Sequence, residues 1–238
     1  MLASGRVEAV LQPIVEMSTG ATVAVEAFAR PPGAAARMDV EGMFIAAQRM
    51  GRSGELDRLC RRAALAAATT VDLHVPLHIN VGVALLVEGD NGLAAVLSEI
   101  AWAGFQPDQV VLELAGLRRP SRFAELLAAY RRAGLRLGLD DVGRGATTIE
   151  SLVAVAPDVL KLSPRLASAA RRSAVGRASL EGIVVAADAR GTRVVAEQVE
   201  SAEDRDLLLA SGVRLGQGYF FAAPARPVGR TRALGGVA

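Results

Sequence analysis

Eight short runs of apolar residues alternate along the chain with longer segments rich in alanine, leucine and arginine. The apolar runs, which we interpret as strands, cover residues 7–15, 21–26, 77–81, 110–114, 135–140, 159–162, 192–196 and 213–217. Helix patterns cover residues 41–50, 55–69, 93–103, 122–133, 148–154, 180–189 and 202–210. Strand and helix in alternation predict a parallel sheet covered by helices. Eight strands favour an α/β fold of the TIM-like (β/α)8 barrel type, with a doubly wound open sheet as the alternative.

The length of 238 residues suits one such barrel, and no segment has the composition of a linker between domains. Hydrophobic residues make up 51% of the chain, which is enough for a large buried core. The sequence therefore predicts a single domain over residues 1–238, with a core at about 7–224 and a flexible tail at 225–238. The Pro/Gly/Ala-rich segment 31–37 is expected to be a loop.

Composition argues against several classes of protein. The single cysteine, Cys60, excludes an internal disulfide and is typical of a reducing, cytoplasmic compartment. Net charge is only +2 and aromatic residues are 4%, so a nucleic-acid polymer is not an expected partner. No stretch approaches the roughly 20 apolar residues that span a bilayer, so we expect no membrane insertion.

A polar residue follows almost every apolar run, at the point where the strand is expected to end. In parallel α/β barrels these ends meet on one face, so the polar side chains should share a cleft. Carboxylates gathered in a poorly solvated site repel one another, and one lysine does not balance them. Hard divalent cations do, and oxygen ligands select Mg²⁺, Mn²⁺ or Ca²⁺ over zinc. The residues are Glu26, Asn80, Glu113, Asp140, Asp141, Lys161, Glu197 and Gln217.

Each of these residues also has a simpler interpretation. A single acid after a strand is more often a helix N-cap or a surface charge, and the two aspartates before Gly143 are also compatible with a plain turn. Recurrence over seven strands favours the metal site. His74 and His78 lack the intervening glutamate of a zinc protease, so His78 is interpreted as an ordinary strand residue.

Longer motifs surround the polar residues and follow one another in a fixed order. The first are Leu11-Gln12-Pro13-Ile14-Val15, Val25-Glu26-Ala27-Phe28-Ala29-Arg30, His78-Ile79-Asn80 and Leu112-Glu113-Leu114. The later ones are Asp140-Asp141 before Gly143, Asp158-Val159-Leu160-Lys161, Val195-Ala196-Glu197-Gln198-Val199-Glu200 and Gln217-Gly218-Tyr219-Phe220. This series, over roughly residues 7–224, resembles the EAL phosphodiesterase family, named for Glu-Ala-Leu.

The resemblance implies a barrel whose first strand runs antiparallel to the others, and it implies a role for each site residue. Glu26, Asn80, Glu113 and Asp140 would bind one metal ion, Asp141 would reach a second, and Glu197 would hold metal or metal-bound water. Lys161 would help to activate the nucleophilic water, and it forms the catalytic set together with Glu26 and Glu197. Gln12, Arg30 and Gln217 would contact substrate, with Arg30 at a phosphate, and Glu200 would steady the loop after Asp141.

The activity implied by the resemblance is hydrolysis of cyclic di-GMP to linear pGpG. Two cations about 3.5–4 Å apart can stabilise both the attacking and the leaving oxygen of a phosphodiester. The expected cofactors are therefore two Mg²⁺ or Mn²⁺ ions, and Ca²⁺ is expected to inhibit. Cyclic di-GMP is the expected partner, and a homodimer is a further hypothesis.

Several positions depart from the family pattern. Phe28 replaces the leucine of the name motif, Val142 and Arg144 alter the loop after the aspartates, Ser163 replaces an aspartate, and Gln198 replaces a glycine. The Ala115-Gly116 pair stands where a second acid is usual. These changes keep open the alternative of a weak or inactive domain that serves as a cyclic di-GMP receptor or a protein-interaction module.

Overall fold

The computed structural model describes residues 6–32, 40–71, 73–86, 92–115, 117, 123–143 and 154–227. Its eight strands close into a barrel in sequence order, with β1 paired to both β2 and β8. β1 is antiparallel to these two neighbours, and every other pair is parallel, which confirms the predicted fold and the reversed first strand. The strands are β1 Glu8–Glu16, β2 Thr22–Arg30, β3 Leu77–Gly82, β4 Val110–Ala115, β5 Arg136–Val142, β6 Val159–Leu162, β7 Arg193–Ala196 and β8 Leu215–Gly216.

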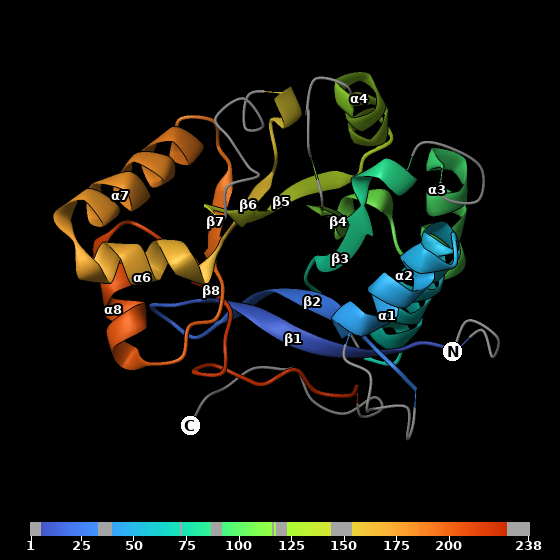
Figure 1. Ribbon diagram of the computed structural model, residues 1–238, viewed down its shortest axis with the longest axis horizontal. Coiled ribbons are helices and arrows are strands. Elements are labelled where there is room, and N and C mark those ends of the chain that lie inside the picture. Colours follow the sequence, from blue (N-terminus) through green and yellow to red (C-terminus); the bar gives the residue numbers. More distant parts are fainter. Residues whose placement is uncertain are drawn as a thin grey trace.

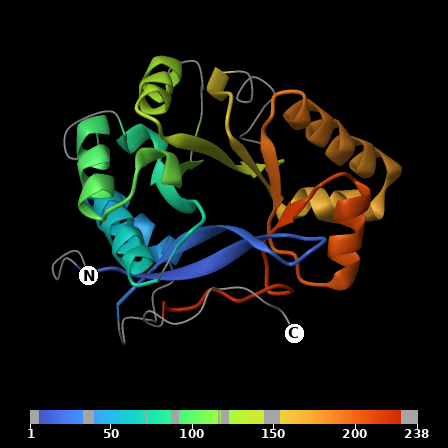
Figure 2. The same ribbon diagram turned by 180° about the vertical axis from the view of Figure 1, so that it is seen from behind.

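Helices surround the barrel, with α1 to α4 on one side and α6 to α8 on the other (Figures 1 and 2). The helices are α1 Val40–Arg49, α2 Ser53–Thr69, α3 Leu93–Trp102, α4 Ala124–Arg132, α6 Pro164–Arg172, α7 Ala174–Asp188 and α8 Ala202–Ala210. Short 3-10 turns, η2 Val83–Leu85 and η4 Pro107–Gln109, lie next to β3 and β4. None of the helices in the described part of the chain is long and apolar enough for a membrane span.

The barrel wall has two apolar surfaces because side chains alternate along each strand. Outward-facing residues such as Leu112, Leu114 and Leu160 pack against the helices in the main core. A smaller cluster fills the inside of the barrel and forms its floor. This floor consists of Ile14, Ala24, Val111, Val159 and Val195, with Val23 and Leu215 packed against it.

The helix prediction was incomplete after β6. Helix α6 was missed, and α7 begins six residues before the predicted start at residue 180. The signal for α6 was present, because Ser163 caps its first turn through its side chain and Pro164 occupies the first helical position. Its nine residues include three arginines and only one large apolar side chain, Leu166, so the segment did not stand out as an apolar run although its two faces are well separated. The predicted helix 148–154 lies outside the described residues except for its last position.

The predicted tail needs a correction at its start. Ala225 forms a bridge with Leu11 of β1, with backbone N···O distances of 2.8 and 2.9 Å. Arg226 forms an ion pair with Glu8, so the ordered chain continues at least to that residue. The remainder of the tail from 228, and most of the predicted loop 31–37, lie outside the described residues.

Candidate active site

The alternation of side chains that builds the floor also brings the predicted polar residues together above it. Glu26, Glu113, Lys161 and Glu197 each lie two residues after a floor residue of their own strand, so all four face the inside of the barrel at its C-terminal mouth. Gln12 precedes its floor residue, but β1 is antiparallel, so Gln12 reaches the same level and pairs in register with Glu26.

Lys161 lies at the centre of this group. Its Nζ atom is 2.6 Å from Oε2 of Glu26, 2.9 Å from Oε1 of Glu197 and 3.1 Å from Oε2 of Glu113. The side chains of Lys161, Glu26 and Glu113 are at most 1% exposed, and that of Glu197 is 18% exposed. One buried ammonium, from β6, therefore joins three carboxylates, two from β2 and β4 and one that directly follows β7.

Two residues of β3 fix the orientation of the acids. Asn80 donates its side-chain N–H to Oε1 of Glu26 at 2.7 Å. His78 places Nδ1 2.6 Å from Oε1 of Glu113, so both oxygens of Glu113 have partners. Gly138 of β5 faces Glu113, and a Cβ atom there would lie 3.3 Å from Cγ of Glu113, so the glycine leaves room for this side chain.

The electrostatics of the cluster follow from burial and from the ratio of acids to bases. Burial and the negative charge of Glu113 raise the pKa of Glu26 well above its usual value. Burial alone would also raise the pKa of Glu113, but Lys161 and the hydrogen bond with His78 outweigh it and lower that pKa to about 2. Burial would lower the pKa of Lys161, but the surrounding carboxylates raise it well above its usual value. Lys161 is therefore a fixed cation in this arrangement.

Asp140, at the end of β5, shows that the lysine does not neutralise the site. Burial is the main reason that its pKa rises to about 7, and the charges of Glu197 and Glu113 add to the rise against the attraction of Lys161. Four carboxyl groups thus share a single ammonium. The excess of negative charge has to be met by protons or by additional cations.

The donor chemistry of this cluster fits a hard divalent cation. Carboxylates of Glu26, Glu113, Asp140 and Glu197 and the amide of Asn80 offer only oxygen ligands, and their charge exceeds that of Lys161. Within the described ranges, however, no three His, Cys, Asp or Glu side chains are already spaced as ligands of one ion. The ammonium of Lys161 lies between the acids instead, so ion binding requires their side chains to turn away from it.

A pocket of about 340 Å³ opens beside the acid cluster, near the lower end of the range for small-molecule sites. Glu197 belongs to both, because it contacts Lys161 and also lines the pocket. The pocket walls come from β1, β2 and the segments after β7 and β8. Its residues are Gln12, Phe28, Arg30, Glu197, Gln198, Glu200, Gln217, Gly218, Tyr219 and Pro224.

The three residues predicted to contact substrate all line this pocket. Gln12 donates its side-chain N–H to the carbonyl of Ala222 at 2.8 Å. Arg30 lies over the ring of Phe28, with its guanidinium carbon 5.7 Å from the ring centre. Gln217 is 3% exposed, and its Nε2 atom has no hydrogen-bond partner among the described residues. This buried N–H group is available to an acceptor on a ligand or a water molecule.

Asp141 and Glu200 lie at the edge of the site. Asp141 adopts a left-handed backbone, with φ of 56°, and its N–H donates to Oδ1 of Asp140 at 2.7 Å. Glu200 is an exposed pocket residue whose backbone N–H donates to Asp204 at 3.2 Å. The structure describes the loop that Glu200 was predicted to steady, after Asp141, only as far as Gly143, so this role stays a prediction.

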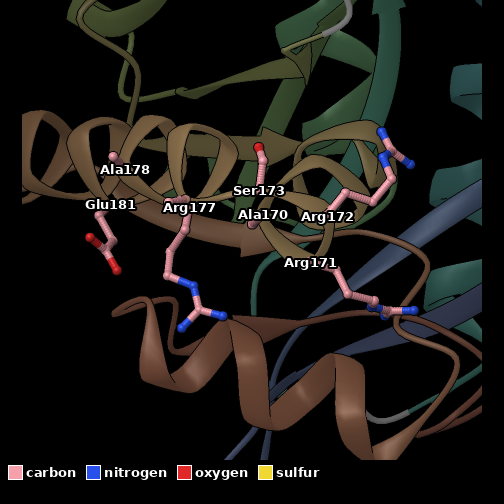
Figure 3. Close-up of a pocket in the computed structure, with 8 residues that line it drawn as sticks. Ala170, Arg171, Arg172, Ser173, Arg177, Ala178 and Glu181 are labelled. Atoms are coloured by element: carbon pink, nitrogen blue, oxygen red, sulfur yellow. The ribbon is translucent and has the colours of Figure 1, made fainter.

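A second hollow, of about 500 Å³, lies on the outer surface where α6 meets α7. Figure 3 shows Arg171 and Arg177 pointing from these helices towards the neighbouring helix, and Arg171 forms an ion pair with Asp204 of α8. None of the predicted site residues lines this hollow. Although this hollow is larger, the pocket at the barrel mouth is the candidate active site because the acid cluster lies beside it.

Sequence reasoning missed the role of His78. This residue lies in β3 as predicted, but it is also 1% exposed and in contact with Glu113. A signal was available, because a residue two positions before Asn80 in a strand must face the same side. A second overlooked signal is that Lys161 is the only lysine among 27 basic residues, the others all being arginine. A buried site for a compact ammonium does not accept the larger guanidinium.

Comparison with known proteins agrees with this geometry. The sequence model of the EAL domain matches residues 1–224. The chain belongs to the EAL domain family. One relative is the probable cyclic di-GMP phosphodiesterase PdeB of Escherichia coli, 27% identical over 88% of this chain and 41% of PdeB. Another is the blue light- and temperature-regulated antirepressor BluF of Escherichia coli, 26% identical over 61% of this chain and 37% of BluF.

The EAL barrel described here also resembles solved structures. The calcium and cyclic di-GMP complex of Klebsiella pneumoniae BlrP1 matches with a TM-score of 0.84 and 28% identity, over 94% of this chain and 57% of the BlrP1 chain. A manganese and cyclic di-GMP complex of the same protein matches with a TM-score of 0.82. The chain thus spans well under two thirds of the length of these proteins, and the similarity concerns their EAL part.

Proposed function

We propose that this EAL domain is a metal-dependent phosphodiesterase that hydrolyses cyclic di-GMP to linear pGpG. The observation that carries the proposal is the cluster of Glu26, Glu113 and Glu197 around Lys161, next to a pocket lined by Arg30. Such a cluster combines an excess of oxygen ligands with a fixed cation. The name of PdeB, a probable cyclic di-GMP phosphodiesterase, and the presence of cyclic di-GMP in the BlrP1 complex support the choice of substrate.

Each site residue has a role in this proposal. Glu26, Asn80, Glu113 and Asp140 would hold one ion, and Asp141 and Glu197 would contribute to a second. When bound, the divalent cations supply positive charge that polarises the phosphodiester oxygens. Mg²⁺ and Mn²⁺ are the proposed activating ions, and we propose that Ca²⁺ supports substrate binding without turnover.

The reaction forms a bond between a water oxygen and phosphorus and breaks one phosphorus–oxygen ester bond. The water loses a proton and the leaving alcohol gains one. Lys161 remains charged because four carboxyl groups raise its pKa, so it offsets the negative charge that develops on the attacked phosphate. Arg30 binds a phosphate oxygen, and Gln12 and Gln217 orient the substrate from the pocket wall.

Chromatography of the reaction with cyclic di-GMP and Mn²⁺ tests the proposal directly. We expect pGpG from the native protein and none from Glu26→Ala or Lys161→Ala. Glu181→Ala, an exposed acid on α7, is the matched control and should keep full activity. If the native protein forms no pGpG in either Mg²⁺ or Mn²⁺, the proposal that it is a phosphodiesterase is wrong.

A non-catalytic role is the second candidate. BluF, which is named an antirepressor, aligns with 61% of the chain. In addition, the ammonium of Lys161 lies between the acids, which would have to turn away from it to bind one ion together. A domain of this kind would bind cyclic di-GMP in Ca²⁺ or Mn²⁺ and release no pGpG in either. Calorimetry in Ca²⁺ together with the chromatographic assay distinguishes it from the enzyme.

Three remaining expectations belong to the same proposal. The chain acts as one EAL domain over residues 1–238, it forms a homodimer, and it works in the cytoplasm without a nucleic-acid polymer or a membrane as partner. Light scattering at several protein concentrations tests the dimer. A mass equal to one chain of 24.7 kDa at all concentrations would exclude it.

A further inference from the structure

The backbone of Gln198 adopts a conformation that residues other than glycine rarely adopt. Its φ angle is 52°, in the left-handed region. A bulky residue persists there only when the surrounding structure imposes the conformation, and such positions concentrate at functional sites. Gln198 follows directly after Glu197, which contacts Lys161.

The residue that follows Gln198 is held by backbone hydrogen bonds through both its N–H and its carbonyl. The N–H of Val199 donates to the carbonyl of Gln217 at 3.0 Å, and the carbonyl of Val199 accepts from Phe220 at 3.0 Å. Gly218 permits this close approach, because a Cβ atom there would lie 2.2 Å from the oxygen of Val199. The backbone at residue 198 is therefore fixed by the neighbouring segment, whichever side chain it carries.

The side chain of Gln198 lines the pocket at the barrel mouth, where it is exposed. Two further carboxamides, Gln12 and Gln217, line the same pocket, and the buried Nε2 of Gln217 has no partner among the described residues. Tyr219, 72% exposed, adds an aromatic ring. Carboxamides pair with the donor and acceptor groups on base edges, and aromatic rings stack on bases.

We propose that Gln198 is a specificity-determining residue of this chain, whose carboxamide contacts the base edge of the cyclic dinucleotide. This inference rests on the proposed function. The phosphates of the ligand carry its negative charge, and Arg30 and the cations would bind them. The neutral carboxamide of Gln198 offers one donor group and one acceptor, which matches the donor and acceptor groups of a base. The left-handed backbone holds this group at the pocket rim before the ligand arrives.

Gln198→Gly tests the proposal, because glycine accepts the imposed backbone and removes only the side chain. Binding of cyclic di-GMP to the Ca²⁺-loaded protein should weaken about three- to tenfold, the range for one lost hydrogen bond. In Mn²⁺, KM should rise by a similar factor while kcat stays unchanged. Binding of cyclic di-AMP should change less, so the preference for cyclic di-GMP over cyclic di-AMP should fall.

Ala156→Gly is the matched control. Ala156 also has a left-handed backbone, with φ of 46°, but it precedes β6 and so lies at the opposite end of the barrel from the pocket. Both glycine variants should raise Tm by about 0–3 °C, and only Gln198→Gly should affect binding.

Unchanged binding in Gln198→Gly, or equal weakening for both dinucleotides, would overturn the base-edge contact and leave the phosphodiesterase proposal intact. A native protein that binds neither dinucleotide in any cation would instead overturn the proposed function, and the inference with it.

Discussion

Replacement of the buried lysine tests the electrostatic argument most directly. Lys161→Met keeps the length of the side chain and removes the ammonium that lies 2.6 to 3.1 Å from three carboxylates. Breaking a buried ion pair by removal of one partner costs about 3–5 kcal/mol, because the other charge is left uncompensated. For a chain of this size the loss corresponds to a decrease in Tm of about 6–20 °C.

The loss of stability in Lys161→Met should be larger at high pH than at low pH. Without the lysine, the carboxyl groups of Glu26 and Glu113 have higher pKa values in the folded protein than in the unfolded chain. The unfolded state then releases protons first, so the free energy of unfolding falls as pH rises through that interval. At pH 5 the acids are partly protonated, and we expect the destabilisation to shrink to about 1 kcal/mol, compared with 3–5 kcal/mol at pH 8.

Urea denaturation in EDTA at both pH values measures these differences. The double variant Lys161→Met with Glu113→Gln is the control, because it removes one buried carboxylate together with the cation. It should be less destabilised than the sum of the two single variants. A Lys161→Met protein within 1 kcal/mol of the native protein at pH 8, or equally destabilised at pH 5 and pH 8, would refute the reasoning.

Three other predictions follow from buried polar groups. The native protein in EDTA should lose about 1–4 kcal/mol of stability between pH 4 and pH 7, because the pKa of Asp140 is raised to about 7 in the folded protein. A series of urea titrations measures this decline, and Asp140→Asn should flatten it. His78→Phe should lower the free energy of unfolding by about 1–3 kcal/mol, because a buried oxygen of Glu113 loses its donor. His78→Asn keeps a donor near the position of Nδ1, so equal losses in the two variants would count against the hydrogen bond. Arg61 of α2 is buried and forms ion pairs with the buried Asp57 of the same helix and with Glu99 of α3. Arg61→Met should cost about 3–5 kcal/mol, because Asp57 then keeps, among the described residues, only the backbone N–H of Gly82 as a partner. Asp57→Asn in the same chain should recover part of that cost in thermal unfolding.

Much of the fold was predictable because the strand pattern is local. Alternation along each strand assigns Val111 and Glu113 to one side and Leu112 to the other, and a polar residue two positions after a floor residue must lie above it. The end of β6 was predicted to the residue for the same reason. Helix α6 was missed because its overall apolar content is low, and because the cap formed by Ser163 and the spacing of its few apolar residues were overlooked.

The sequence by itself determined which chemical groups reach the mouth of the barrel. Residue type and the period of two along each strand are local properties, so Glu26, Glu113 and Lys161 could be assigned to one face before any contact was known. Only the tertiary structure decided how these groups pair. Lys161 and Glu26 are 135 positions apart, and closure of the barrel brings them within 2.6 Å. The contact of His78 with Glu113 and the left-handed turn at Gln198 depend on neighbouring strands in the same way, because no local pattern encodes the register between distant segments.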